Sequence, residues 1–489
     1  MKGVWTVERV RDAERRVFER TPEAALMRRA AFAVAVRSAE LLTEHTGGTA
    51  GRRVALLVGA GNNGGDALWA GAFLRRRGVA VTAVLLAPER AHAEGLAALR
   101  RAGGRRVSVP EDGETARAVV AEADLVIDGI VGLSGRGPLR VDAEALVAAV
   151  TGLVVAVDVP SGVDPDTGAV SGPAVQADVT VTFGGRKPGH VLGEGAVFAG
   201  AVSVADIGLG DELGEPDIVL LDAADLGALW PVPGPEDDKY TQGVTGVAAG
   251  SAAYPGAAVL ATGAAVLATS GMVRYAGPAA DAVRTRWPEV VATGSIGDAG
   301  RVQAWVVGPG LGTGAAGRDV LAHALGQGVP VCADADAINL LASTPELWDA
   351  RDPDTPLVLT PHEREFARLA GDVGADRVAA ARRAAERYNA VVLLKGHTTV
   401  VAAPDGRVLV NRARGAWPAT AGSGDVLSGL IGALLAAGTD PWLAAGCAAG
   451  VHELAGDLAA DGAPIGASAL LRAIPDAVRM VRTAAAASA

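Results

Sequence analysis

Three loops in the first half of the chain carry carboxylates and glycines that could bind a ligand and move protons. The loop at 59–66 reads Gly-Ala-Gly-Asn-Asn-Gly-Gly-Asp and follows the apolar run 53–58. Two later apolar runs lead into Asp128 and Asp158, each followed by a glycine-containing stretch. Glycines let backbone N–H groups approach a phosphate, and a helix N-terminus adds about half a positive charge. The loops therefore predict an anionic ligand, although each one alone could be a tight turn or a helix cap.

Oxygen-bearing side chains in these loops also indicate a cation site. Asn63, Asp128 and Ser161 offer the hard oxygen ligands that alkali and alkaline-earth cations prefer. In open parallel sheets such residues meet at the carboxyl ends of the strands. The spacing itself does not prove that the three converge, so their convergence is an expectation for the structure.

The second half contains a glycine-rich stretch that could support phosphoryl transfer. Residues 419–429 read Ala-Thr-Ala-Gly-Ser-Gly-Asp-Val-Leu-Ser-Gly and precede an apolar, helix-like run at 430–437. Backbone N–H groups at this helix start would form an anion hole, and Asp425 could accept a proton from a hydroxyl. The alternative is that Asp425 only caps the helix, which is worth about 1 kcal/mol.

Lysine is rare in this chain. The sequence contains four lysines, so forty of its 44 Lys and Arg residues are arginine. Apart from Lys2 they are Lys187, Lys239 and Lys395, and all three lie beside a motif. Arginine is a rigid planar fork whereas lysine is a compact point charge, so these positions are predicted to need the latter. Chance placement is the alternative.

Both halves alternate short β-branched runs with longer Ala, Leu and Arg stretches, which is typical of βαβ units around a mostly parallel sheet. In the first half the expected strands are 53–58, 79–86, 125–130, 153–159 and 179–183. In the second half they are 246–249, 304–307, 329–333, 356–359 and 390–394, with a hairpin of 398–403 and 407–410 around Pro-Asp-Gly. The sequence therefore predicts an α/β fold in each half.

The chain is long enough for two or three domains at a prior of about 150 residues each. After Asp206 it becomes acidic and proline-rich, ending in Trp-Pro-Val-Pro-Gly-Pro-Glu-Asp-Asp at 230–238. Such a stretch is typical of an interdomain linker. We therefore expect one domain at 1–215, a linker at 216–238 and a second domain at 239–489.

Composition excludes several classes of protein. A formal net charge of −11 gives no overall footprint for nucleic acid. Cys332 and Cys447 lack CxxC spacing, so neither a disulfide framework nor a zinc site is predicted. The first twenty residues have no apolar signal-peptide core, and the apolar segment 255–273 is interrupted by glycines and hydroxyl residues. We expect a cytoplasmic enzyme that binds no membrane and forms a homo-oligomer.

The motifs between residues 62 and 189 resemble the NAD(P)H-hydrate epimerase family. They are Asn62-Asn63-Gly64-Gly65-Asp66, Asp128 with its loop to 138, Asp158-Val-Pro-Ser-Gly162 and Phe183-Gly-Gly-Arg-Lys-Pro-Gly189. The resemblance implies potassium binding by Asn63, Asp128 and Ser161. It implies substrate binding by Asn62, Asn63, Gly64, Gly65, Asp66, Gly132, Leu133, Ser134, Gly135, Arg136, Gly137, Pro138 and Asp158. Ala67 departs from the glycine that the family commonly has there, which affects this turn.

Chemistry assigns roles within this set. Epimerising a hydroxylated ring carbon next to a ring nitrogen requires proton transfer, or ring opening and reclosure. Asp158 is the candidate general acid or base, and Lys187 is a charge partner that favours its ionised form. The alternative is that Lys187 only neutralises a phosphate or a turn carboxylate.

The second half is similar to the NAD(P)H-hydrate dehydratase family, a branch of the ribokinase-like superfamily. Besides 419–429, the matching stretches are Gly250–Ala258, Val307–Gly312, Asp334–Asn339, Leu359–Glu365 and Leu394–Thr399. The resemblance implies nucleotide contacts from Lys395, Gly396, His397, Thr398, Thr399 and Gly424. It implies hydrate contacts from Ala258, Gly310, His362 and Asp425, with Asp425 as catalytic base. Ser423 and His397 depart from the usual residues and bear on nucleotide fit, and His362 taken alone could be structural.

Together the resemblances imply two three-layer αβα domains, the first Rossmann-like and the second ribokinase-like. They imply repair of hydrated NADH and NADPH, with ADP as phosphoryl donor, magnesium as its cation, and AMP and phosphate as products. Phosphorylation of the ring hydroxyl would turn a poor leaving group into phosphate. Two alternatives stay open: a vitamin-type small-molecule kinase with a regulatory N-terminal domain, and a binding module without chemistry.

Overall fold

The computed structural model describes residues 1–269, 271–413 and 415–488. The chain divides into two compact units. Gly3–Ile218 form the N-terminal unit, and Val219–Ala489 together with Met1–Lys2 form the C-terminal unit. Each unit is built around its own sheet and its own hydrophobic core.

The N-terminal unit contains seven strands in the order β4-β3-β2-β5-β6-β7-β8, and all neighbours are parallel. The strands are β2 (Arg53–Val58), β3 (Ala80–Leu85), β4 (Arg105–Ser108), β5 (Leu125–Gly129), β6 (Leu153–Val157), β7 (Val179–Phe183) and β8 (Ala201–Ala205). Five of them lie where the sequence predicted strands. The parallel α/β sheet of the first half is therefore confirmed.

Helices cover both faces of this sheet. They are α1 (Val7–Phe18), α2 (Glu23–Thr46), α3 (Asn62–Arg75), α4 (Ala93–Arg101), α5 (Gly113–Ala121), α6 (Val141–Val147) and α7 (Gly195–Phe198). Strand side chains alternate in direction. Val54 and Leu56 of β2 therefore join the core under α2 and α3, whereas Ala55 and Leu57 join the core under α5 and α6. The result is three layers, helix on sheet on helix.

The C-terminal unit contains a mixed sheet. Its strands are β9 (Ile218–Leu220), β10 (Val244–Ala248), β11 (Met272–Ala276), β12 (Val291–Thr293), β13 (Ala304–Val307), β14 (Val331–Ala333), β15 (Leu357–Leu359), β16 (Val391–Leu394), β17 (Thr398–Ala402) and β18 (Val408–Arg412). They run in the order β9-β18-β17-β16-β15-β14-β13-β10-β11-β12. Among these ten strands, the β16–β17 and β17–β18 pairs are antiparallel and the other neighbouring pairs are parallel. The β17–β18 pair is the hairpin that Pro-Asp-Gly predicted, with φ of 90° at Gly406.

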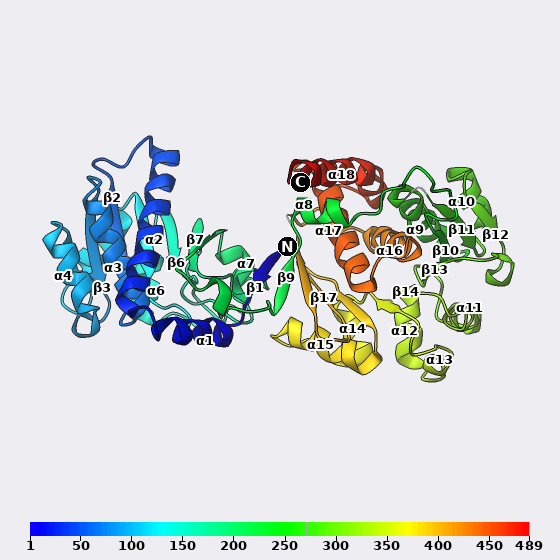
Figure 1. Cartoon of the computed structure of the whole chain (residues 1–489), viewed down its shortest axis with the longest axis horizontal. Helices are drawn as coiled ribbons and strands as arrows, with labels where there is room; N and C mark the ends of the chain where they lie inside the picture. The colour runs from blue at the N-terminus through cyan, green and yellow to red at the C-terminus, as the bar shows by residue number, and fades with distance from the viewer. Residues whose placement is uncertain (270, 414, 489) are drawn as a thin grey trace. The chain divides into compact units, whose positions relative to one another are not determined.

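The helices of this unit also form two layers, seen above and below its strands in Figure 1. One layer contains α8 (Ala223–Leu229), α9 (Pro255–Ala268), α16 (Ser423–Ala436), α17 (Pro441–Ala460) and α18 (Ala467–Ser488), whose apolar residues share one core with the sheet. The other includes α11 (Ala315–Leu325), α12 (Asp336–Ser343), α13 (Glu346–Asp349), α14 (Glu363–Ala370) and α15 (Arg377–Tyr388). A short helix, α10 (Ala280–Arg286), packs beside α9.

Part of the segment interpreted as an interdomain linker is folded into the C-terminal unit. β9 pairs with β18, and α8 packs against α18. Leu226 and Trp230 are buried, and Trp230 Nε1 donates to Ala268 O at 3.0 Å. The acidic and proline-rich composition of the segment made it read as a linker, although it contains these two buried apolar residues. Within 216–238, residues 216–217, 221–222 and 230–238 have neither helix nor strand.

The apolar segment 255–273 contributes α9, a 14-residue helix with buried alanines in the core of its unit. Among the helices of the described residues, none combines the length and the apolar character that crossing a bilayer requires.

Candidate active sites

The N-terminal unit brings Asp158 and Lys187 together in an almost solvent-free pair. Lys187 Nζ lies 2.6 Å from Asp158 Oδ1, and the two side chains are 1% and 6% exposed. The same ammonium group donates to Thr182 Oγ1 at 2.8 Å and to Phe183 O at 3.0 Å. Thr182 Oγ1 in turn donates to Asp158 Oδ1 at 2.9 Å. All three ammonium hydrogens therefore have acceptors, and one carboxylate oxygen has two donors.

His190 holds the backbone of this pair. Its Nδ1 accepts from the Lys187 backbone N–H at 3.0 Å, so Nε2 must carry the proton that it donates to Asp158 O at 2.7 Å. The pKa of His190 is lowered to about 4, mainly by burial and also by the nearby charge of Lys187. Asp158 has φ of 66°, which is strained for a residue other than glycine. A neutral His190 thus supports a strained aspartate at the end of β6.

Three predicted loops meet beside this pair. A Cβ at Gly132 would lie 2.3 Å from Asn63 Oδ1, so only glycine allows this approach. Asn63 Nδ2 donates to Val157 O at 2.7 Å, next to Asp158. Val131 N donates to Ser161 Oγ at 3.0 Å. The loops that follow β2, β5 and β6 are therefore joined by direct contacts, as expected for the carboxyl edge of a parallel sheet.

The remaining residues predicted to bind the epimerase substrate differ in accessibility. Gly64, Gly65 and Asp66 are buried in the first turns of α3, whereas Asn62 is exposed and donates to Glu23 Oε1 at 2.9 Å. In the loop 132–138, Gly132, Leu133 and Gly135 are half-buried and Ser134, Arg136, Gly137 and Pro138 are exposed. Their contacts with substrate stay predictions.

Two further carboxyl groups of this unit have raised pKa values. Burial raises the pKa of Asp66 well above its usual range, and the charges of Asp158 and Glu14 raise it further. Burial likewise raises the pKa of Glu14, followed by the charge of Asp158, while Lys187 opposes the shift. Asp66 Oδ1 is buried and has no hydrogen-bond partner among the described residues. Asp66 and Glu14 are therefore harder to ionise than exposed carboxyl groups.

Asp128 and Ser161 of the predicted potassium set are in contact. Asp128 accepts hydrogen bonds from Ser161 Oγ and Ser161 N, both at 2.8 Å, and from Ile130 N at 3.1 Å. Burial raises the pKa of Asp128 to about 6, and its hydrogen bonds oppose that shift. No cationic side chain contributes to the shift, so a bound cation would supply the missing charge. Asn63, Asp128 and Ser161 offer oxygen ligands, which suit a hard cation such as potassium.

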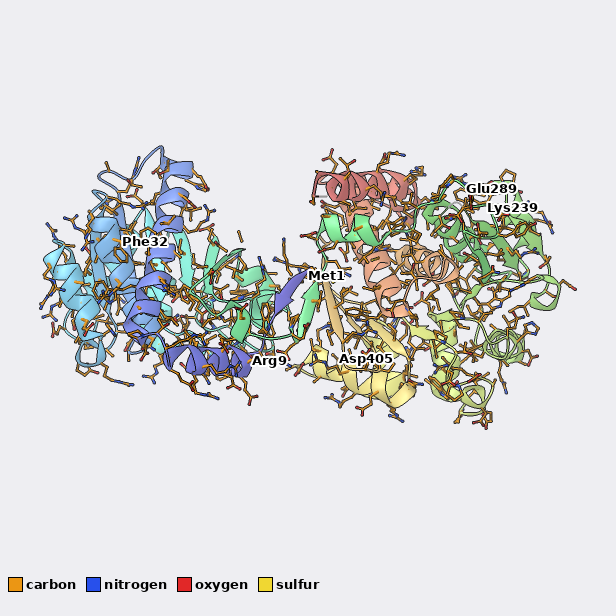
Figure 2. All side chains as sticks on the ribbon, viewed as in Figure 1. Met1, Arg9, Phe32, Lys239, Glu289 and Asp405 are labelled. Atoms are coloured by element: carbon orange, nitrogen blue, oxygen red, sulfur yellow. The ribbon has the colours of Figure 1, made fainter. Side chains whose placement is uncertain are left out.

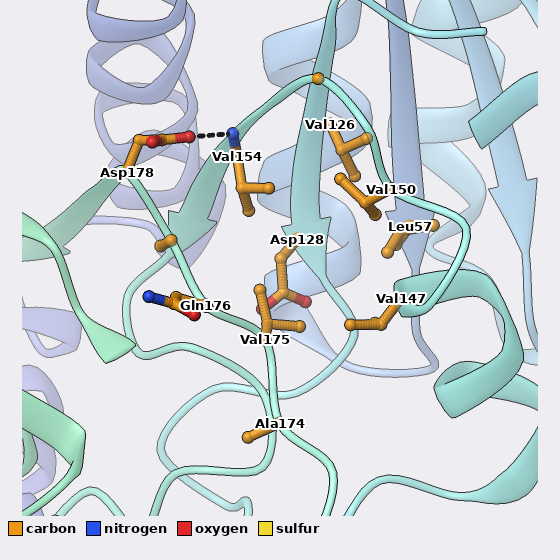
Figure 3. A pocket seen from close by; sticks show the side chains of 12 residues that line it. Leu57, Val126, Asp128, Val147, Val150, Val154, Ala174, Val175, Gln176 and Asp178 are labelled. Carbon is orange, nitrogen blue, oxygen red and sulfur yellow. Dashed lines mark hydrogen bonds between the residues drawn. The ribbon is translucent and has the colours of Figure 1, made fainter. Parts of the chain in front are cut away.

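A cavity of about 370 Å³ lies beside Asp128. Its lining includes the valine side chains of Val147, Val154 and Val175, and Figure 3 shows the Asp128 carboxylate pointing into the space between them. The lining contains neither Asp158 nor Lys187. The cavity therefore borders the predicted cation site and not the Asp158–Lys187 pair.

The C-terminal unit contains a second lysine–aspartate pair. Lys395 Nζ, at the end of β16, lies 2.7 Å from Asp334 Oδ1, at the end of β14. Thr360 Oγ1 and Ser428 Oγ lie 2.8 Å from the two oxygens of Asp334. Glu365 Oε2 is 4.0 Å from Lys395 Nζ. The Asp334 side chain is 2% exposed, but that of Lys395 is 22% exposed.

Asp425 lies at the start of α16, beside this pair. Burial raises the pKa of Asp425 to about 7, and the charge of Asp334 raises it while Lys395 opposes the shift. A Cβ on Gly424 would lie 3.4 Å from Lys395 Nζ, so the glycine loop and the ammonium group are adjacent. Gly422 has φ of 86°, which favours glycine. The arrangement brings together a carboxyl group, an ammonium group and the N–H groups of a helix start.

His452 of α17 contacts the first residue of α16. Its Nε2 lies 3.0 Å from Ser423 O and 3.1 Å from Ser423 Oγ. Burial lowers the pKa of His452 to about 4, so it is neutral in the physiological range. The imidazole therefore fixes the first residue of α16 without adding charge.

The other predicted residues of this unit lie at neighbouring loop ends. Gly310 is in contact with the start of α9, because a Cβ there would be 3.0 Å from the Cβ atoms of Tyr254 and Ala257, and Ala258 is buried in the next position. His362 caps α14, where Nδ1 accepts from Arg364 N and Glu365 N, and its side chain is 48% exposed. His362 therefore has a structural role as the N-cap of α14, which was the alternative to contact with the hydrate.

In the predicted nucleotide segment, Gly396 and His397 are exposed, whereas Thr398 and Thr399 are buried in β17. Sequence reasoning gave no role to Asp334, Glu365, His190, His452 or Glu14. For Asp334 a signal existed, since Asp334-Ala-Asp-Ala-Ile-Asn follows a predicted strand. For the two histidines none existed, because a single histidine in an apolar stretch is usually structural.

Comparisons with known proteins agree with this division. Residues 23–189 match the family model described as YjeF-related protein N-terminus, and residues 245–476 match that of NAD(P)H-hydrate dehydratase. The bifunctional NAD(P)H-hydrate repair enzyme Nnr of Mycobacterium tuberculosis is 55% identical over 442 residues, which cover 90% of each chain.

Two further relatives match the second half. The ADP-dependent (S)-NAD(P)H-hydrate dehydratase of Neisseria meningitidis is 41% identical over 259 residues, covering 50% of this chain and 87% of its own length. The structure of the Bacillus subtilis ADP/ATP-dependent NAD(P)H-hydrate dehydratase co-crystallised with ATP/Mg²⁺ is 27% identical, with a TM-score of 0.48, covering 53% of this chain and 97% of that one. With two sites on two α/β sheets and similarity along nearly its whole length, the chain belongs to the family of bifunctional NAD(P)H-hydrate repair enzymes.

Proposed function

We propose that the N-terminal unit interconverts the R and S hydrates of NADH and NADPH, and that the C-terminal unit dehydrates the S hydrate at the expense of ADP. The observation that carries this proposal is the presence of two separate carboxylate sites, Asp158 with Lys187 and Asp425 with Lys395. A kinase with a regulatory N-terminal half would not need the first site.

In the C-terminal unit, Asp425 takes the proton of the ring hydroxyl while the hydroxyl oxygen attacks the terminal phosphorus of the nucleotide. Lys395 and the N–H groups at the start of α16 stabilise the charge on the transferred phosphoryl group. The ring nitrogen then expels phosphate, and loss of a proton from the neighbouring carbon restores the dihydronicotinamide. With ADP as donor the products are AMP and phosphate.

The accompanying cations are assigned by their chemistry. Potassium would be held by Asn63, Asp128 and Ser161, where it supplies positive charge next to the substrate loops. In the described part of the chain, no three His, Cys, Asp or Glu side chains form a metal-binding cluster. Magnesium would therefore bind mainly through the phosphates of the nucleotide, whose oxygens it prefers. We place the reaction in the cytoplasm, and a homo-oligomer stays a prediction.

The deciding experiment incubates the full-length protein with separated R and S hydrates and either ADP or ATP. Recovery of dihydronicotinamide absorbance is followed together with the nucleotide products. We expect the S hydrate to react without delay and the R hydrate to react only through epimerisation. A stable phosphorylated product formed from ATP would instead support a small-molecule kinase, and no reaction with either hydrate would contradict the proposal.

A further inference from the structure

The lysine predicted to bind the nucleotide, Lys395, is held by its backbone as well as by its side chain. Its N–H donates to Pro361 O at 2.9 Å, in the loop that follows β15. Its carbonyl oxygen accepts from Arg377 Nη2 at 3.0 Å, and its ammonium group pairs with Asp334. Lys395 is therefore fixed at three points, and Arg377, the first residue of α15, supplies one of them.

Helix α15 brings the Arg377 guanidinium group to this loop. The helix packs against β16 and β17, and Ala381 and Ala385 are buried on its inner side. Asp376 caps its start, where Oδ1 accepts from Ala379 N at 2.9 Å. Because the packing fixes the helix and the cap fixes its first turn, the first side chain of α15 has a defined place at the end of β16.

The guanidinium group serves two acceptors at once. Nη2 donates to Lys395 O, and Nη1 pairs with Oε1 of Glu363, the first residue of α14. The Arg377 side chain is 17% exposed, whereas that of Glu363 is 65% exposed. A planar fork holds two acceptors in fixed directions, but an ion pair with an exposed partner adds little stability. The main effect of Arg377 is therefore on the position of the loop.

Gly396 leaves the space that the guanidinium group occupies. A Cβ on Gly396 would lie 2.5 Å from Arg377 Nη2 and 3.2 Å from its Cζ. Both distances are shorter than an ordinary van der Waals contact. Because the nearest atom is the end of a long side chain, an alanine here would push the guanidinium group aside. Glycine at this position therefore allows Arg377 to reach Lys395 O.

We propose that Arg377 is a positioning residue of the nucleotide site, which orients Lys395 through its carbonyl group, and that Gly396 is required for this contact. The inference rests on the proposed ADP-dependent dehydration. Arg377 fixes the direction in which the chain leaves β16, so that Lys395 Nζ stays beside Asp334 and Gly424. Loss of Arg377 weakens the use of the nucleotide and spares the binding of the hydrate.

The test measures dehydration of pure S hydrate by the full-length protein over a range of ADP concentrations. For Arg377→Met we expect the KM for ADP to rise by about 10-fold or more, since a hydrogen bond from a charged donor is lost. The KM for the S hydrate should stay close to that of the parent. Arg383→Met, on an exposed position of the same helix, is the matched control and should behave as the parent.

Gly396→Ala tests the link between the two residues. If this glycine serves the approach of Arg377, the alanine raises the KM for ADP as Arg377→Met does, and the double variant is no worse than either single one. If the two increases multiply in the double variant, Gly396 acts independently of Arg377 and the proposed link is wrong.

An unchanged KM for ADP in Arg377→Met would overturn the inference, and so would equal increases in the KM for ADP and for the S hydrate. If this variant does not fold, Glu363→Gln decides, because it removes only the second acceptor of the guanidinium group: a raised KM for ADP supports the role and an unchanged one contradicts it. Absence of ADP-dependent dehydration in the parent would remove the proposed function itself, a result distinct from failure of Arg377. Epimerisation in the same samples controls for the integrity of the N-terminal unit.

Discussion

Each unit contains a lysine–aspartate pair at the carboxyl edge of its sheet, but the two pairs differ in burial and in hydrogen bonding. Lys187 is 1% exposed and donates to three protein acceptors. Lys395 is 22% exposed and has one acceptor, Asp334, within hydrogen-bonding distance among the described residues. The first ammonium group is fully used by the protein, whereas the second keeps hydrogens for a ligand.

This difference separates two uses of the same side chain. A saturated ammonium group fixes the charge and position of its carboxylate partner and cannot bind phosphate. An unsaturated one, fixed on one side by Asp334 and adjacent to the glycine loop of α16, can bind the phosphates of a nucleotide. We therefore expect Lys187 to act through Asp158 and Lys395 to contact the ligand directly.

The strongest way to break this comparison is Lys187→Met. Removing one partner of a buried pair leaves Asp158 desolvated and uncompensated, which costs about 3–5 kcal/mol of stability. We expect the unfolding transition of the N-terminal unit to fall sharply in calorimetry and epimerisation to be lost. An unchanged transition would mean that solvent reaches Asp158. The dehydratase rate of the same preparation is the control.

Asp425→Asn asks whether proton abstraction in the C-terminal unit depends on one carboxylate. The amide keeps the shape of the side chain but loses its basicity, so dehydration should slow by about 10²- to 10⁴-fold, with nucleotide affinity and epimerisation retained. Steady-state rates and nucleotide titration measure both effects. A variant with more than about a tenth of the parent rate, under conditions where chemistry limits both, would exclude Asp425 as the base.

Lys395→Met is the counterpart of Lys187→Met and should separate the two pairs. Because Lys395 is partly exposed and Asp334 keeps Thr360 and Ser428 as partners, the loss of stability should be smaller than for Lys187. The KM for ADP should rise by about 10- to 100-fold, since a charge-assisted contact with phosphate is worth roughly 1.5–3 kcal/mol. Equal destabilisation by both substitutions would contradict the comparison.

The pH dependence of dehydration gives a finer test. The pKa of Asp425 is about 7, and the base must be ionised, so dehydration should rise as the pH increases through about 7. Asp334→Asn removes a charge that raises this pKa and should move the limb to lower pH by about one unit. The rate is measured with saturating ADP. A limb that stays in place would show that burial alone sets the pKa.

The smallest expected effect concerns the cation. Asp128→Ala removes the one charged member of the predicted potassium set, so potassium should no longer raise the melting temperature of the N-terminal unit. Sodium and choline at equal ionic strength are the controls. Identical potassium-dependent shifts in variant and parent would exclude Asp128 from the site.

The alternation of apolar runs predicted most strands of both sheets, because burial between two helical layers leaves a strong sequence pattern. It missed β4 and β8, which form the two edges of the N-terminal sheet and are less buried. The scarcity of lysine singled out Lys187 and Lys395 as positions that need a compact charge, and in the structure each forms an ion pair with an aspartate. Lys239, labelled in Figure 2, is instead exposed and lies over the ring of Tyr240.

The residues that sequence reasoning missed act across long separations. Asp334 meets Lys395 from 61 positions away, and the contact depends on β14 and β16 lying on either side of β15. A local motif cannot encode such meetings, since they depend on strand order and helix docking.

The hydrogen bonds of His190 have a spectroscopic consequence. With Nδ1 accepting from Lys187 N and Nε2–H donating to Asp158 O, the ring is locked in one tautomer and shielded from solvent. Its ¹⁵N resonances should therefore show no titration between about pH 5 and 9 and a slowly exchanging Nε2 proton. The chain has seven histidines, so this signal can be assigned by substitution. It would act as an internal NMR reporter of the epimerase site, sensitive to displacement of either Asp158 or Lys187.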